Sequence, residues 1–139
     1  MPEYLNVTTR GGVVGDDTHF TLFFQGMGLD PDKSYTIKVI ELEYPNNAAY
    51  APEVRPIMLC DQSKPISDNS YTRQIIFKSP FPSGVASRVY CNSTNSPSIV
   101  RPLLNNSFTS IEVRFDKNDG TGPYVMTDYV SLLFEIDEV

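Results

Sequence analysis

The alternation of apolar and polar residues is the feature that most constrains the fold of this chain. It is clearest near the C-terminus, where every second residue of one segment is apolar: Val130, Leu132, Phe134 and Ile136. A period of two residues indicates a β-strand with one buried face. No window of ~11 residues keeps the helical period, because proline, glycine or β-branched residues interrupt each one. The sequence therefore predicts an all-β protein.

Nine segments show strand character, with clusters of Gly, Pro, Asn, Asp and Ser between them. They are Glu3–Thr9, Thr18–Gln25, Ser34–Tyr44, Val54–Cys60, Tyr71–Lys78, Ser87–Asn92, Ser98–Leu104, Phe108–Asp116 and Tyr129–Ile136. Pro56 lies in the fourth segment, and because proline donates no backbone hydrogen bond, it predicts a sheet edge or a bulge there. In the fifth segment, Ile75 and Phe77 are expected to share one face. About eight or nine strands, with turn signals every ~8 to 15 residues, predict an antiparallel sandwich or jelly roll.

The length and charge of the chain limit its organisation and its partners. Its 139 residues predict one domain, 1–139, in which residues 1–17 form a candidate N-terminal arm. The net charge is −6, and the 11 Lys and Arg residues are scattered without a basic run, which argues against direct, sequence-specific binding of nucleic acid. No stretch approaches ~18 apolar residues, and the N-terminus lacks a signal core, so we expect neither a membrane partner nor an export signal.

Few residues of the chain bind metals or take part in catalysis readily. His19 is the single histidine, and Cys60 and Cys91 lack metal-ligand spacing. Because transition-metal sites draw on clusters of His and Cys, the sequence predicts no metal and no cofactor. We expect the two cysteines to be buried free thiols.

Two acidic patterns resemble functional motifs but favour ordinary structure. Residues 116–120 resemble the start of a calcium loop, yet the twelfth position is Thr127 instead of Glu, so a tight turn is expected. Glu41 and Glu43 lie on one face of a strand, about 7 Å apart, a spacing that loosely suits a glycosidase. A solvated strand end explains them more simply. We therefore expect no catalytic site and no enzymatic activity.

Several segments together resemble the single jelly-roll capsid proteins of DNA viruses of the polinton, adintovirus and virophage kind. These segments are Phe20–Phe24, Leu29–Asp32, Tyr44–Asn47, Phe108–Phe115 and Tyr129–Phe134. The resemblance is to their penton or minor capsid proteins, and it spans most of the chain. It implies a structural protein of about eight strands that assembles inside the host cell into a virion. Its implied partners are other copies, as a homopentamer first and a trimer second, and other capsid subunits.

The long loops hold aromatic and proline residues that anchor interfaces at low conformational entropy cost. The candidate interface residues are Tyr44, Tyr50, Pro52, Pro56, Phe81, Pro123 and Tyr124. A simpler interpretation is that these side chains cap the ends of the sandwich.

Two other functions remain open at this point. A lectin-like sandwich would stack aromatic side chains on sugar rings, and the chain has eight tyrosines for this purpose but no tryptophan. A trimeric ligand of the tumour necrosis factor type has a similar strand pattern. Assembly that depends on salt and protein concentration would favour the capsid function, whereas glycan binding by a monomer would favour the lectin.

Overall fold

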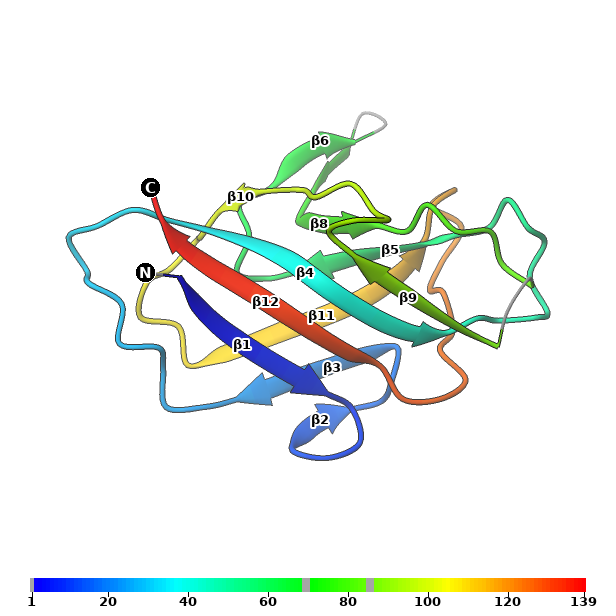
Figure 1. Ribbon diagram of the computed structural model, residues 1–139, viewed down its shortest axis with the longest axis horizontal. Coiled ribbons are helices and arrows are strands. Elements are labelled where there is room, and N and C mark those ends of the chain that lie inside the picture. The colour runs from blue at the N-terminus through cyan, green and yellow to red at the C-terminus, as the bar shows by residue number, and fades with distance from the viewer. Residues whose placement is uncertain (1, 69–70, 85–86) are drawn as a thin grey trace.

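The structure is a computed structural model that describes residues 2–68, 71–84 and 87–139. Within these ranges the regular secondary structure consists of β-strands alone, and the strands pair antiparallel, most of them in two packed sheets. The predicted all-β antiparallel sandwich is therefore confirmed. Two five-stranded sheets pack face to face, and a two-stranded ribbon lies beside them (Figure 1).

The strands of the first sheet, sheet A, are β1 (Glu3–Thr8), β12 (Ser131–Glu138), β4 (Tyr35–Pro45), β9 (Arg88–Asn92) and β10 (Arg101–Pro102). This sheet has β1 at one edge. At its other edge two short strands, β9 and β10, pair with different stretches of β4, one after the other. Sheet B runs, in spatial order, through β2 (Val13–Gly15), β3 (His19–Phe23), β11 (Ser110–Lys117), β5 (Pro56–Cys60) and β8 (Ile75–Lys78). The ribbon contains β6 (Ile66–Asp68) and β7 (Tyr71–Arg73).

The path of the chain alternates between the sheets. The order β1-β12-β4-β9 in sheet A faces the order β3-β11-β5-β8 in sheet B. Taken along the sequence, these eight strands change sheet at each step except between β5 and β8. Neighbours in a sheet are therefore distant in sequence, as in β1 and β12, and they hold both termini in sheet A.

The main core lies between the sheets and follows from the predicted alternation. In β11, Ile111, Val113 and Phe115 are fully buried, whereas Glu112 and Arg114 point outward. β12 repeats the pattern with its own buried apolar residues opposite β4. Because side chains of a strand alternate between faces, each strand supplies one apolar row to the core.

The predicted position of Pro56 at a sheet edge is wrong. Pro56 begins β5, which lies between β11 and β8, and it pairs with Lys117. A proline fits the first residue of a strand, where a missing N–H does not break the ladder. The bulge of this strand lies further along, between Met58 and Leu59.

That bulge also overturns the expectation that Ile75 and Phe77 share a face. Phe77 packs in the main core, whereas Ile75 packs on the outer face of sheet B with Ile57 and Leu59. The β6 residue Ile66 packs against this outer cluster, so β5 is buried on both faces.

A short hairpin near the N-terminus was not predicted, because its composition indicates only a turn. Gly15 ends β2 with a φ of 114°, and a side chain there would clash with the carbonyl oxygen of His19. Asp16 closes the turn, since its Oδ1 accepts hydrogen bonds from the N–H groups of Thr18 and His19, each at 2.9 Å. The candidate N-terminal arm, residues 1–17, thus includes two strands that pair within the same chain.

Candidate functional site

Three tyrosines gather at one end of the sandwich, the right-hand end in Figure 1, which we call the tyrosine end. Tyr44 lies in β4, Tyr50 in loop 46–55, and Tyr124 in loop 118–130. The ring centroids of Tyr44 and Tyr124 are 6.3 Å apart, and those of Tyr50 and Tyr124 are 4.9 Å apart, both edge to face. This geometry suits the quadrupoles of aromatic rings. The cluster therefore joins β4 to two loops.

The buried hydroxyl groups of this end are paired with one another. The hydroxyl of Tyr44 lies 2.6 Å from Oγ of Ser79, and that of Tyr124 lies 2.8 Å from Oγ of Ser83. The N–H of Asn47 donates to the Tyr124 hydroxyl at 3.3 Å. Burial raises the pKa of Tyr44 well above its ordinary value, so this phenol stays neutral.

Two buried asparagines connect the loops directly. Asn46 donates from Nδ2 to the carbonyl of Pro82 and accepts from the N–H of Gly84 at 2.9 Å. Asn47 donates from Nδ2 to the carbonyl of Val125 at 3.1 Å. Buried amides are stable only when their groups are paired, so these bonds fix the relative positions of three loops.

The predicted interface residues all lie at or near the tyrosine end, but they differ in exposure. Three are buried inside the subunit: Tyr44, Pro56 and Tyr124. Four reach the surface in full or in part: Tyr50, Pro52, Phe81 and Pro123. The buried three stabilise the end of the sandwich, as the simpler interpretation held, and only the other four are accessible to a partner.

Two of the accessible residues line hollows in the surface. Phe81 lines a hollow of about 290 Å³ together with Pro82 and Tyr90. Pro123 lines another of about 390 Å³, on whose wall His19 also lies. Each hollow places an apolar side chain beside polar groups, which is the usual composition of a contact site.

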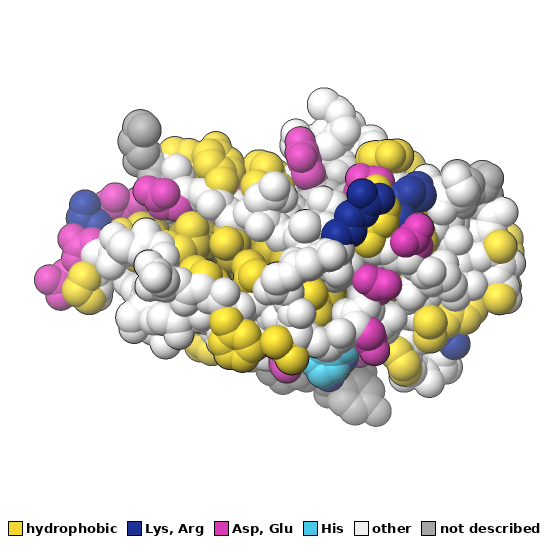
Figure 2. Space-filling model, turned by 90° about the horizontal axis from the view of Figure 1, so that it is seen from below, with side chains coloured by type: hydrophobic (Ala, Val, Ile, Leu, Met, Phe, Trp, Pro, Cys, Tyr) yellow, Lys and Arg dark blue, Asp and Glu magenta, His cyan; other side chains and the backbone are white. Residues whose placement is uncertain are grey.

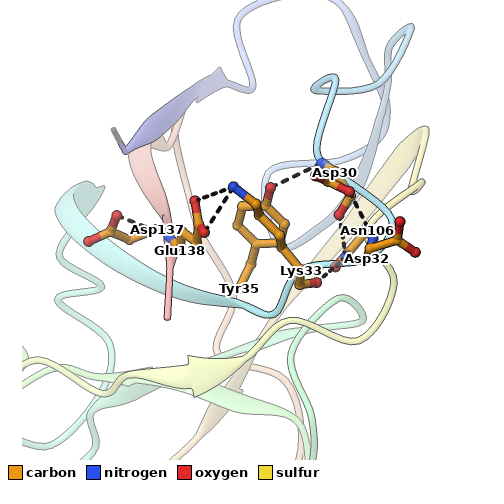
Figure 3. Close-up of polar contacts among 7 residues, drawn as sticks. All are labelled: Asp30, Asp32, Lys33, Tyr35, Asn106, Asp137 and Glu138. Carbon is orange, nitrogen blue, oxygen red and sulfur yellow. Dashed lines mark hydrogen bonds and ion pairs between the residues drawn. The ribbon is translucent and has the colours of Figure 1, made fainter.

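The opposite end, which we call the Lys33 end, is held by exposed polar groups (Figure 3). Nζ of Lys33 lies 3.2 Å from Oε1 of Glu138, and both side chains are nearly half exposed. Nδ2 of Asn106 donates to the carbonyls of Asp30 and Lys33, and the Tyr35 hydroxyl accepts from the N–H of Asp30. The hydrogen bond with Glu138 raises the pKa of Lys33.

A groove of about 280 Å³ crosses the outer face of sheet A. The antiparallel register places Glu41 opposite Asn92 and Glu43 opposite Tyr90, so their side chains share this face. Asn6 and Ser131 add further polar groups. Both glutamates line the groove. Glu43 forms an ion pair with Arg88, whereas Glu41 is exposed to solvent.

Glu43 is held by an arginine that the sequence did not single out. Nε of Arg88 lies 2.6 Å from Oε1 of Glu43, and the Tyr129 hydroxyl donates to the same oxygen at 3.2 Å. Arg88 and Arg10 also lie over the Tyr129 ring, at 3.9 and 3.7 Å from its centroid. Burial opposes ionisation of Glu43, but the hydrogen bond and charge of Arg88 outweigh it and lower the pKa. No sequence spacing indicates this contact.

The remaining candidate residues occupy ordinary structural positions. Nε2 of His19 lies 3.2 Å from Oε2 of Glu112, and both side chains are half exposed. Cys60 and Cys91 are buried and free, as predicted, and burial raises the pKa of the Cys60 thiol to about 12. The predicted reversal after β11 is confirmed, with the N–H of Lys117 bonded to the carbonyl of Gly122.

Neither metal ligands nor a membrane-spanning helix was found in the part of the chain that the structure describes. No group of three or more His, Cys, Asp or Glu residues lies close enough there to hold a metal ion. Likewise, none of the described residues form a helix of sufficient length and hydrophobicity to span a bilayer. No family model matches the chain, and no curated protein matches its sequence.

Proposed function

We propose that this chain is a single jelly-roll structural protein that assembles into a viral capsid and carries no catalytic site. The observation that supports this most is the strand order, with β1-β12-β4-β9 facing β3-β11-β5-β8. Two four-stranded sheets between which the chain alternates are the arrangement of jelly rolls, which are frequent in capsids.

The tyrosine end gives such a subunit a fixed surface. Its loops are joined by paired buried side chains, so Pro52, Phe81 and Pro123 are presented on an ordered support. Ordered loops lose little conformational entropy when they bind, which favours association. The proposed partners are copies of this chain, as a homopentamer first and a trimer second, together with other capsid subunits in a virion.

Light scattering across protein concentration and salt tests the proposal. A discrete pentamer, a trimer or a larger shell is the expected result, because a capsid subunit must contact its neighbours. A strict monomer at the highest concentrations reached would contradict it. The variant Phe81→Ser with Pro123→Ser changes one partly buried and one exposed side chain. Weaker assembly of a double variant that folds normally would assign the contact to the tyrosine end.

A second candidate, glycan binding, is favoured by the groove on sheet A. Tyr90 is 62% exposed beside Glu41 and Asn92, which places an aromatic face next to groups that bond sugar hydroxyls. Screening the wild type and Tyr90→Ala on immobilised glycans tests it. Binding by the wild type that the variant loses would support it, whereas no binding by either would oppose it.

A further inference from the structure

One segment of this acidic chain carries a net positive charge. Of the 11 Lys and Arg residues, five lie in residues 62–106, whereas of the 17 Asp and Glu residues only Asp68 does. This segment forms β6 to β10, and so builds one whole edge of the sandwich, with β8 ending sheet B and β9 and β10 ending sheet A. We call it the basic edge. It lies at the top of Figure 1.

The opposite edge is built by β1, β2 and β3, and we call it the acidic edge. Residues 3–23 include these strands and the loops between them. They carry three acidic side chains, Glu3, Asp16 and Asp17, and one basic side chain, Arg10. The side chain of His19 is half exposed. β1 pairs only with β12 and β2 only with β3 among the described strands, so one side of each is without a ladder.

The acidic edge also exposes apolar surface. Figure 2 views this edge and shows hydrophobic side chains along it, with acidic side chains toward both of its ends and Lys or Arg side chains beside them. Leu5, Leu22 and Phe24 are only partly buried against the core. Val14 and Phe23 are each 64% exposed. Unpaired strand edges with exposed apolar residues associate with other chains unless they are covered.

The basic edge carries matching groups. Lys64 and Lys78 are exposed, and Arg101 is half-buried and bonds the carbonyls of residues 64 and 65. Val100 and Leu104, at 50% and 51% exposed, lie in the same segment. The two edges are therefore opposite in charge, and each also offers apolar side chains.

We propose that the acidic edge of one copy docks on the basic edge of the next. This deepens the assembly function proposed above and rests on it. Such a head-to-tail contact joins two different surfaces, so a chain of copies keeps one free edge at each of its two ends until a ring closes. Apolar contact supplies the affinity. The opposite charges set the orientation of the two copies and disfavour contact between two acidic edges or two basic edges.

Nucleic acid is the less suitable occupant of the basic edge. Arg73 is bonded to Asp116 at 2.7 Å and Arg88 to Glu43 at 2.6 Å, so at least two of the five cations already have carboxylate partners. Binding to a phosphate backbone depends on many cations that contact it together. Apolar residues between the cations suit a protein surface better.

Charge reversal at each edge tests the proposal. The variant Glu3→Lys with Asp17→Lys makes the acidic edge positive, and Lys64→Glu with Lys78→Glu makes the basic edge negative. Each variant alone is expected to raise the dissociation constant of assembly about tenfold or more, because like charges then meet. An equimolar mixture of the two should associate again, since each variant offers an edge that complements the other. Because the two variants must alternate, open chains or even-numbered rings are expected from the mixture instead of a closed pentamer or trimer.

The control is Asp30→Lys with Asp32→Lys, which makes the same change in net charge as the first variant on two exposed residues of the Lys33 end, outside the strands of both edges. It should assemble as the wild type does. Circular dichroism spectra must match across all variants, and light scattering is the readout. Loss of assembly by each variant without rescue in the mixture would overturn the proposal.

The outcomes separate this inference from the function on which it rests. A wild type that stays monomeric contradicts both. A wild type whose assembly neither reversal weakens, or whose assembly the control weakens equally, overturns only the edge contact. Binding of single-stranded DNA that Lys64→Glu with Lys78→Glu abolishes, without any change in assembly, would assign the basic edge to nucleic acid and overturn the docking of two copies there.

Discussion

The tyrosine end and the Lys33 end both tie loops together with polar side chains, but the first network is buried and the second lies in water. At the tyrosine end, Tyr44 and Tyr124 are almost fully buried, and their hydroxyls pair with serines. At the Lys33 end, the ion pair with Glu138 is nearly half exposed. Water replaces a lost partner at one end and cannot easily reach the other.

This difference shows why one end can serve as a rigid support and the other cannot. An unpaired buried hydroxyl costs about 1–3 kcal/mol, whereas an exposed ion pair contributes about 0–1 kcal/mol at most. The tyrosine end therefore has few alternative arrangements of similar energy. The proposed assembly contact at Phe81 and Pro123 relies on this rigidity, whereas the proposed contact between the two edges relies on opposite charge.

Truncation of the central tyrosine should have the largest effect. Tyr124→Ala removes a fully buried ring and two hydrogen bonds, so we expect a loss of about 3–5 kcal/mol in the free energy of unfolding. Urea denaturation followed by circular dichroism measures it. Tyr4→Ala, at a side chain that is 52% exposed, is the matched control and should change stability little. Equal effects would show that the tyrosine end is not a packed unit.

Removal of a single hydroxyl should have a smaller effect with a diagnostic pattern. Tyr44→Phe leaves the Ser79 hydroxyl without its 2.6 Å partner, and we expect a loss of about 1–3 kcal/mol. Ser79→Ala should cost a similar amount. The double variant should cost less than both added together, because neither hydroxyl is then left without the other, although the N–H of Phe81, which donates to Oγ of Ser79 at 3.3 Å, loses a partner. Strictly additive losses in the same urea experiment would show that the two hydroxyls act independently.

The two buried cysteines, Cys60 and Cys91, allow the same comparison of buried and exposed groups to be made in the core. Burial raises the pKa of Cys60 to about 12 and raises that of Cys91 as well, so both thiols are protonated near neutral pH. We expect an aromatic disulfide reagent at pH 8 to label the native protein slowly, and urea-unfolded protein at once. Rapid labelling in native buffer would contradict the burial.

The same pKa shifts make stability depend on pH. Because the folded-state pKa values are raised, the contribution of the protonated thiols to the free energy of unfolding is present below the ordinary thiol pKa of 9.0 and falls as pH rises above it.

The ion pair of the Lys33 end should have the smallest effect. Glu138→Gln removes a partner that solvent replaces, so the urea midpoint at neutral pH should equal that of the wild type. The pKa of Lys33 is raised in the folded state, so the pair contributes below pH 10.5 and loses its contribution as pH rises further. A clear drop in midpoint for Glu138→Gln, beyond that for Tyr4→Ala, would remove the contrast between the two ends.

Local pattern predicted much of the fold but little of the candidate site. Strands with strict alternation, such as Ser110–Lys117, were placed within about two residues, because their burial follows from a period of two. The predicted sheet edge at Pro56 and the shared face of Ile75 and Phe77 were wrong, since the pairing of β5 with both β11 and β8 and the bulge in β5 are tertiary features. The contact between Arg88 and Glu43 had no signal in the sequence either.

The sequence by itself determined the all-β class, the buried rows of β11 and β12, and the uneven distribution of charge between residues 62–106 and the rest. These depend on residue types and on spacing along one strand, which are local properties. Only the tertiary structure decided that Tyr44 and Tyr124 are buried while Phe81 and Pro123 are accessible, and that acidic and basic segments form opposite edges. Those facts depend on pairing between strands far apart in the chain, and this pairing is a property of the packed sheets as a whole.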